Sequence, residues 1–137
     1  MGAYEVIQAQ ISFASGSYRV SESIGTATIT VTLDQVLPLT ATVDYTTAKS
    51  DIPFVATPGQ DYLTSTGVLT FTPGVTDQHF TISISDDKLV EHDENLRLIL
   101  SHGVAPNIIV HLDALMTFTI VDNDYRSYVP LIVIGNG

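Results

Sequence analysis

The chain has 137 residues, of which 45% are hydrophobic, which fits one folded domain with a core and excludes a disordered acidic tail. Asp and Glu number 15 against 5 Lys and Arg, a net charge of −10, so we expect no nucleic-acid partner and no attraction to anionic lipid. Cysteine is absent, which excludes disulfides and thiolate metal sites.

Alternation of apolar and polar residues dominates the chain and predicts half-buried antiparallel strands. Residues 27–33 are the clearest case, because Ala, Ile, Val and Leu occupy one face and Thr the other. In chain order, we predict strands near residues 8–13, 18–20, 26–33, 40–47, 68–72, 80–85, 96–100 and 116–121. About seven short strands separated by turns rich in Ser, Gly and Pro indicate an all-β protein with a β-sandwich fold.

Three stretches lack a clear strand pattern. Residues 49–60 contain Pro53 and Pro58 and are long for a hairpin loop, so we expect them to cross between elements. Residues 103–113 are expected to be irregular. We assign residues 1–124 to one domain and residues 125–137 to an apolar tail, which is either an extra edge strand or a linker.

Targeting signals are not evident in the sequence. No apolar run approaches the ~18 residues that a membrane-spanning helix needs, so we expect no membrane insertion. The first residues lack the basic and apolar regions of a signal peptide. We therefore expect an excised part of a larger surface or secreted protein, with an extracellular or cell-surface location.

Acidic residues gather beside the predicted strand ends. Glu22 precedes the third predicted strand, and Asp61 lies in the connection between the fourth and the fifth. Residues 86–94 hold five acids between two further strands, and Asp122 and Asp124 follow the last strand. If consecutive strands alternate in direction, all of these acids lie at one pole of the sandwich.

Carboxylates gathered at one pole favour a bound cation. Two unit charges about 4 Å apart repel by roughly 4 kcal/mol at an effective dielectric near 20, whereas a domain is stable by only about 5–15 kcal/mol. Calcium fits best, because it takes about 6–8 oxygen ligands from irregular loops, while magnesium prefers a stricter octahedron. Zinc favours His or Cys, but the histidines are scattered and are expected to lie on the surface: His79, His92, His102 and His111.

Four segments form a pattern when they are taken together. They are VSESIGTATITVTL at 20–33, GQDY followed by GVLTFTPG within 59–74, ISISDDKLVEHDENLRLIL at 82–100 and FTIVDND at 118–124. Together they resemble the Calx-beta domain family over about Ile11–Asp124. The resemblance implies a seven-stranded antiparallel sandwich related to the immunoglobulin fold. It also implies a module of a larger protein, since such domains occur in sodium/calcium exchangers, an integrin beta chain and adhesion-type proteins.

The resemblance also implies the metal ligands. In calcium-binding members, acids at one pole hold Ca²⁺. The implied ligands in this chain are Glu22, Asp61, Asp86, Asp87, Glu91, Glu94, Asp122 and Asp124. Asp93 alternates away from its neighbours and is expected to face solvent. The implied function is a calcium-binding module, rigidified at one pole, that supports adhesion or interdomain structure with neighbouring domains as partners. A protein or glycan partner stays open, and its identity is unknown.

Other interpretations of the same acids remain open. They are also typical of solvated turns, and Asp61 is also typical of a residue that caps local backbone amides. The alternative function is then a calcium-independent structural spacer or protein-interaction module. Paired carboxylates also serve glycosidases, but acids that are many, close together and carried on turns suit a cation better. We therefore expect no enzymatic activity.

Overall fold

The computed structural model describes residues 6–87 and 90–123, which form nine strands and one 3-10 helix. The elements are β1 (Ile7–Phe13), β2 (Ser17–Ser21), η1 (Glu22–Ile24), β3 (Thr26–Leu33), β4 (Ala41–Lys49), β5 (Thr66–Phe71), β6 (Asp77–Ser83), β7 (Glu94–Val104), β8 (Ile108–Asp113) and β9 (Leu115–Val121). This part of the chain holds no helix with the length and hydropathy that crossing a bilayer requires. The proposed tail at 125–137 lies outside the described residues.

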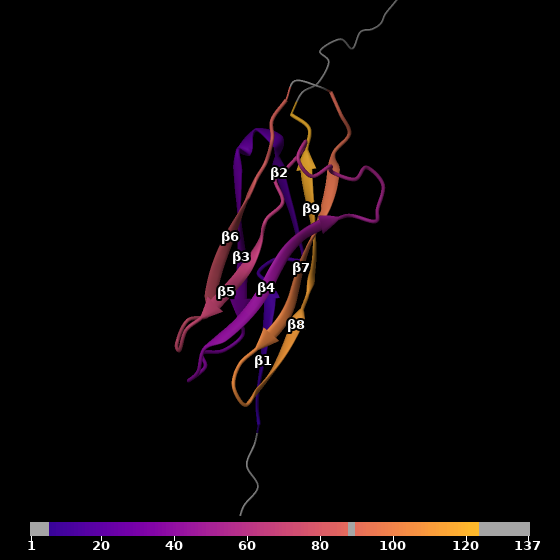
Figure 1. The fold of residues 1–137 in the computed structure, drawn as a ribbon. Helices are drawn as coiled ribbons and strands as arrows, with labels where there is room; N and C mark the ends of the chain where they lie inside the picture. The colour runs from indigo at the N-terminus through magenta and orange to yellow at the C-terminus, as the bar shows by residue number, and fades with distance from the viewer. Residues whose placement is uncertain (1–5, 88–89, 124–137) are drawn as a thin grey trace, which may run out of the picture.

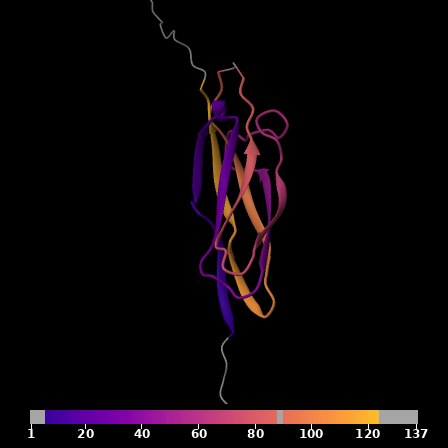
Figure 2. The same ribbon diagram turned by 90° about the vertical axis from the view of Figure 1, so that its left-hand side faces the viewer.

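The strands form two sheets that pack face to face as an elongated sandwich, seen from two perpendicular directions in Figures 1 and 2. One sheet has the order β6-β3-β1-β8 and the other has the order β2-β9-β7-β4-β5. The predicted all-β, immunoglobulin-like sandwich is thus confirmed. The connection after β4 joins it to β5, its neighbour in the same sheet.

The prediction of seven antiparallel strands was wrong, because two strands exchange sheets partway along. β1 pairs with β3 in one sheet, and the chain then continues as β2 beside β9 in the other. In the same way, only Ala114 separates β8 from β9. Both halves of each interrupted strand run in the same direction, so β1 pairs with β8, and β2 with β9, in parallel. Such exchanges form the corners of sandwiches, and they raise the strand count without reversing the chain.

The expectation that residues 103–113 are irregular was also wrong. β7 continues to Val104, and β8 follows after a short turn at Ala105–Asn107. In β8, partly buried Ile108, Val110 and Leu112 alternate with exposed residues, but one of those exposed residues is Ile109. Because Ile109 is apolar although it faces outward, the two-residue period is hard to see in the sequence.

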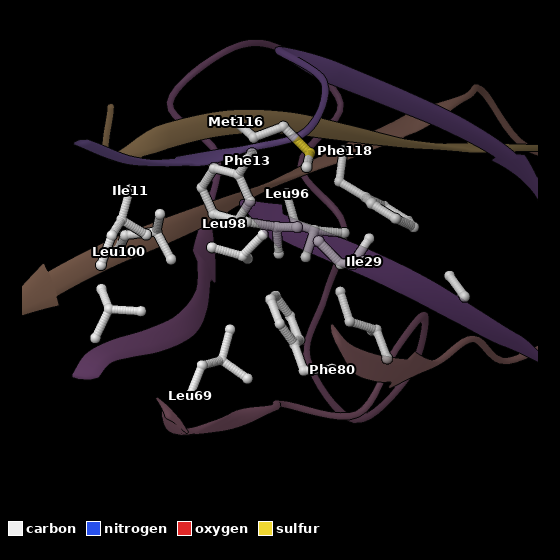
Figure 3. Close-up of a cluster of buried hydrophobic side chains, with 14 of the residues drawn as sticks. Ile11, Phe13, Ile29, Leu69, Phe80, Leu96, Leu98, Leu100, Met116 and Phe118 are labelled. Carbon is white, nitrogen blue, oxygen red and sulfur yellow. The ribbon is translucent and has the colours of Figure 1, made fainter. Parts of the chain in front are cut away.

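The core lies between the sheets and is built from the inward face of every long strand, as Figure 3 shows. In β3 the four apolar residues of the alternating pattern are all buried, while the threonines point away from the core. Tyr45 stacks on Phe80 across the two sheets at 4.0 Å between ring centroids. The fully buried side chains labelled in Figure 3 include Ile11, Ile29, Leu96, Leu98, Leu100 and Phe118.

The strand directions agree with the predicted alternation. β3, β5 and β7 begin at the end of the sandwich where β2, β4, β6 and β9 finish, which is the upper end in Figure 1. We call this end the acidic pole, because the segments that carry the predicted ligands lie there. The exchanges between sheets do not alter this result, since the chain keeps its direction through each of them.

Candidate metal centre

Three connections bring carboxylates to the acidic pole. The 3-10 helix η1, between β2 and β3, carries Glu22, and the β4–β5 connection carries Asp61. The β6–β7 connection carries Asp86, Asp87 and Glu91, and it ends where Glu94 begins β7. Asp122 follows β9 directly. Every predicted ligand in the described residues thus lies in a segment at this pole, with Asp61 inside the β4–β5 connection and the others nearer to strand ends. Asp124 lies outside those residues.

The first carboxylate group consists of Glu22, Asp87 and Glu91. One carboxylate oxygen from each lies within 4.8 Å of the other two. Glu22 is only 3% exposed, unusual for an ionisable side chain unless it is paired or bonded. Its Oε1 accepts a hydrogen bond from the backbone N–H of Asn123 at 3.4 Å, which ties η1 to the end of β9. The group and the bond from Asn123 together connect η1, the β6–β7 connection and the end of β9, which are far apart in the sequence.

The second group consists of Asp61, Glu91 and Glu94, whose carboxylate oxygens again lie within 4.8 Å of one another. Asp61 also accepts a hydrogen bond from the Thr57 backbone N–H at 2.7 Å, so it caps its own turn while it faces the group. That turn depends on Gly59, whose φ of 88° favours glycine. Glu91 belongs to both groups, so the two form one continuous cluster of oxygen ligands.

The pKa of Glu94 reflects the burial of this carboxyl group and the negative charge around it. Its pKa is raised from 4.5 to about 7, first by burial and then by the charge of Asp61 and Glu91. A hydrogen bond with Asp61 and the charge of Asp87 raise this pKa further. Desolvation and like charges both disfavour the ionised form of a carboxyl group. The site thus holds a proton up to near neutral pH, and a cation would offset the same repulsion.

Asp122 and Asp93 hold the cluster in place from its edge, and neither belongs to the two groups. The Asp122 Oδ2 accepts a hydrogen bond from the Glu91 backbone N–H at 2.8 Å. Asp93 Oδ1 accepts one from the Asp122 N–H at 3.1 Å, and Asp93 Oδ2 forms an ion pair with Arg19 at 3.1 Å. Asp93 is thus outside the candidate ligands, as predicted, but it is engaged rather than simply solvated. Asp86 is exposed and lies outside both groups.

The donor set fits calcium better than zinc. Both groups within the described residues contain only Asp and Glu, so every candidate ligand atom is a carboxylate oxygen. His92 lies next to Glu91 but stacks on Phe54 at 4.1 Å between ring centroids. The remaining histidines contact residues outside the cluster: His79 contacts Thr30, His102 contacts Asp44 and His111 contacts Gln8.

Asn95 and the segment 50–56 also lie beside the site, although the sequence does not predict this. Asn95 follows Glu94 and makes hydrogen bonds with residues 53–56, about 40 positions earlier in the chain. No local sequence pattern predicts this contact, because an Asn near the start of a strand is common. The one sequence feature that bears on it is the length of the 49–60 connection.

Comparison with known proteins agrees with the fold and with the acidic motifs. Residues 6–124 match the family profile of the Calx-beta domain. The chain is 31% identical to the sodium/calcium exchanger Calx of Drosophila melanogaster over 116 residues, 82% of this chain and 11% of that protein. It is 33% identical to sodium/calcium exchanger 1 of Bos taurus over 106 residues, 77% of this chain and 10% of that protein. The extracellular matrix organizing protein FRAS1 of Mus musculus is 34% identical over 77 residues, 56% of this chain and 2% of that protein.

Solved structures of two of these domains are similar to this one. The apo-form CBD1 domain of Calx superposes with a TM-score of 0.75 and 28% identity, covering 85% of this chain and 98% of that chain. The calcium binding domain CBD12 of CALX1.1 gives a TM-score of 0.73 and 29% identity, covering 83% of this chain and 44% of that chain. The chain spans about a tenth of the length of its exchanger relatives, so it corresponds to one domain of each.

Proposed function

Because this chain belongs to the Calx-beta domain family, we propose that it is a calcium-binding module whose acidic pole holds Ca²⁺. The observation that carries the proposal is the pair of carboxylate groups that share Glu91. The proposed ligands are Glu22, Asp61, Asp87, Glu91 and Glu94 from the two groups, with Asp86, Asp122 and Asp124 completing the set. The similarity to CBD12 of CALX1.1, which is a calcium binding domain, supports the choice of ion.

The physical role that we propose is rigidification of the acidic pole. The ligands of the two carboxylate groups come from η1, the β4–β5 connection, the β6–β7 connection and the first residue of β7. Backbone bonds join parts of these segments, such as the bond from the Ser85 N–H to the Asp61 carbonyl at 3.0 Å. A bound Ca²⁺ supplies the positive charge that offsets repulsion among these carboxylates. With that repulsion offset, the three connections hold one arrangement, and the acidic pole becomes a firm surface for an adjoining domain.

We place this module in a larger protein, where it supports adhesion or interdomain structure. β1 begins at the opposite end of the sandwich from the pole where β9 finishes, which suits domains joined end to end (Figure 1). The match to an extracellular matrix organizing protein favours an extracellular or cell-surface setting. The exchanger matches favour a second candidate, in which calcium binding changes how the domain contacts its neighbour.

A calcium-independent spacer is the alternative function, and a titration separates the two. Chelator-stripped protein is titrated with CaCl₂ by calorimetry, and its melting temperature is recorded with and without calcium. The calcium-binding module gives saturable heat and a clear rise in melting temperature, since a ligand that binds only the folded state stabilises it. A spacer gives neither, and that result would overturn the proposal.

A matched pair of variants locates the site. Asp87→Asn removes one charge from the first group and is expected to weaken calcium binding by roughly tenfold or more, because affinity follows the number of charged ligands. Asp77→Asn removes the same charge at the start of β6, an exposed position at the far end of the sandwich. It is expected to leave the Kd unchanged. Equal losses in both variants would mean that binding depends on net charge and not on the acidic pole.

A further inference from the structure

The segment 50–56, which we call the 50–56 loop, is fastened to the start of β7 by hydrogen bonds from Asn95 and by an ion pair between Arg97 and Asp51 at 3.8 Å. The Asn95 backbone N–H donates to the Phe54 carbonyl at 2.8 Å, and the Asn95 carbonyl accepts from the Ala56 N–H at 2.8 Å. The Asn95 side-chain Nδ2 donates to the Pro53 carbonyl at 3.1 Å. Its Oδ1 accepts from the Thr119 hydroxyl on β9 at 2.8 Å. Asn95 therefore connects β9, β7 and the 50–56 loop.

The 50–56 loop also contacts the residue next to Glu91. Phe54 has a φ of 64°, in the left-handed region that side-chain-bearing residues rarely adopt. The residue is 53% exposed, yet its ring packs against the His92 ring at 4.1 Å between centroids, with the two planes tilted by 31°. A disfavoured backbone conformation persists only where the surroundings impose it, and such positions concentrate at functional sites. Here the bonds to Asn95 on both sides of Phe54 impose it.

These contacts affect the positions of two proposed calcium ligands, Glu91 and Glu94. Residues 90–93 are outside any strand, so no ladder of backbone hydrogen bonds holds Glu91 in place. Among the bonds of this stretch, Asp122 accepts from the Glu91 N–H, Asp93 accepts from the Asp122 N–H, and Arg19 pairs with Asp93. The contact between the Phe54 and His92 rings adds to these bonds, and it comes from the 50–56 loop. Glu94 immediately precedes Asn95 in the chain, so the position of Asn95 also affects the Glu94 backbone.

We propose that Asn95 is a positioning residue for the calcium site and that it acts by holding the 50–56 loop against the segment that carries Glu91 and Glu94. The inference rests on the proposed function. The Asn95 side chain is engaged with the Pro53 carbonyl and the Thr119 hydroxyl, so we assign it no ligand role. Partners that orient metal ligands typically change metal affinity by about 10–100-fold when they are removed. Loss of the Asn95 side chain leaves Glu94 and Glu91 present but less well oriented.

The test measures the Kd of Ca²⁺ by calorimetry for Asn95→Ala against a matched control. Gln78→Ala removes a bond of the same kind, since the Gln78 Nε2 donates to the Thr70 carbonyl at 2.9 Å, but it lies far from the acidic pole. We expect the Kd to rise about 10–100-fold for Asn95→Ala and to stay at the wild-type value for Gln78→Ala. Melting temperatures in chelator record how much each variant loses in stability alone.

A second variant covers the case in which Asn95→Ala does not fold. Phe54→Gly relieves the positive φ and removes the stack on His92. We expect its melting temperature in chelator to stay close to wild type while its Kd for Ca²⁺ rises. A purely structural loop would give the opposite pattern, with stability changed and affinity untouched. In wild type, calcium should also slow hydrogen exchange at the Ala56 N–H, which bonds to Asn95.

The outcomes separate this inference from the function on which it rests. If wild type takes up no calcium, the proposed function fails. If wild type binds calcium and Asn95→Ala or a folded Phe54→Gly binds it equally well, the positioning role alone is overturned. A rise in Kd as large in Gln78→Ala as in Asn95→Ala would overturn it too, because the effect would then be general destabilisation.

Discussion

Replacing Glu94 with glutamine should have opposite effects on stability with and without calcium. In the metal-free protein, the pKa of Glu94 is raised to about 7 by burial and by its acidic neighbours, against 4.5 for an ordinary glutamate. The folded state therefore binds a proton more tightly than the unfolded state. The stability linked to this proton is fully present below about pH 4.5 and is lost as the pH rises through about 7.

The size of the effect follows from the two pKa values. Each pKa unit corresponds to about 1.4 kcal/mol, so the difference between 4.5 and about 7 amounts to at most about 3.5 kcal/mol. Glu94 is partly exposed, and solvent screening lowers this figure to about 1–2 kcal/mol. For a domain of this size, that loss corresponds to a fall of about 3–8 °C in melting temperature between pH 5 and pH 8.

The assay is thermal unfolding of wild type and Glu94→Gln in chelator at pH 5 and pH 8, repeated in excess CaCl₂. Every other titratable group is common to the two proteins, so the difference between them at each pH isolates Glu94. In chelator, the variant should match wild type at pH 5 and be more stable at pH 8. In calcium at pH 8 it should be less stable, because the neutral amide is a poorer ligand than the carboxylate.

Two results would refute this reasoning. In chelator at pH 8, a variant less stable than wild type would mean that the ionised Glu94 carboxylate is favourably paired in the metal-free protein. A variant that gains as much from calcium as wild type does would remove Glu94 from the proposed ligands. The first result contradicts the electrostatic argument, and the second contradicts the ligand assignment.

Three further substitutions test other parts of the structure. Glu91→Gln should weaken calcium binding more than Glu22→Gln in calorimetry, because Glu91 serves both carboxylate groups; equal losses would contradict a shared ligand. Tyr62→Phe should raise the free energy of unfolding in urea by about 1 kcal/mol, because the Tyr62 hydroxyl is buried without a hydrogen-bond partner among the described residues; a loss of stability would mean that the hydroxyl is bonded. Gly67→Ala should lower that free energy by about 1–3 kcal/mol, because its Cβ would lie 2.8 Å from the hydroxyl oxygen of Tyr45, whose ring is stacked on Phe80; an unchanged denaturation midpoint would show that Tyr45 moves aside freely.

The sequence by itself determined the strands that have a clear two-residue period, their inward faces and the end of the sandwich where the acids gather. The alternation in β3 shows why, since a two-residue period is written in neighbouring residues and forces Ile29 and Val31 to one face. The position of Glu22 or Asp122 beside a strand end is equally local. Once strand directions alternate, positions of this kind meet at one pole whatever the details of pairing.

Only the tertiary structure decided how those residues contact one another. The exchange of β1 into β2 and of β8 into β9 depends on which sheet offers the better partner along each stretch, and local periodicity does not record that choice. The sharing of Glu91 between two carboxylate groups, the Asp122 bond to its N–H and the hold of Asn95 on the 50–56 loop join residues that lie about 30–70 positions apart. Such contacts depend on the register of several strands at once, so they become definite only when the two sheets are packed together.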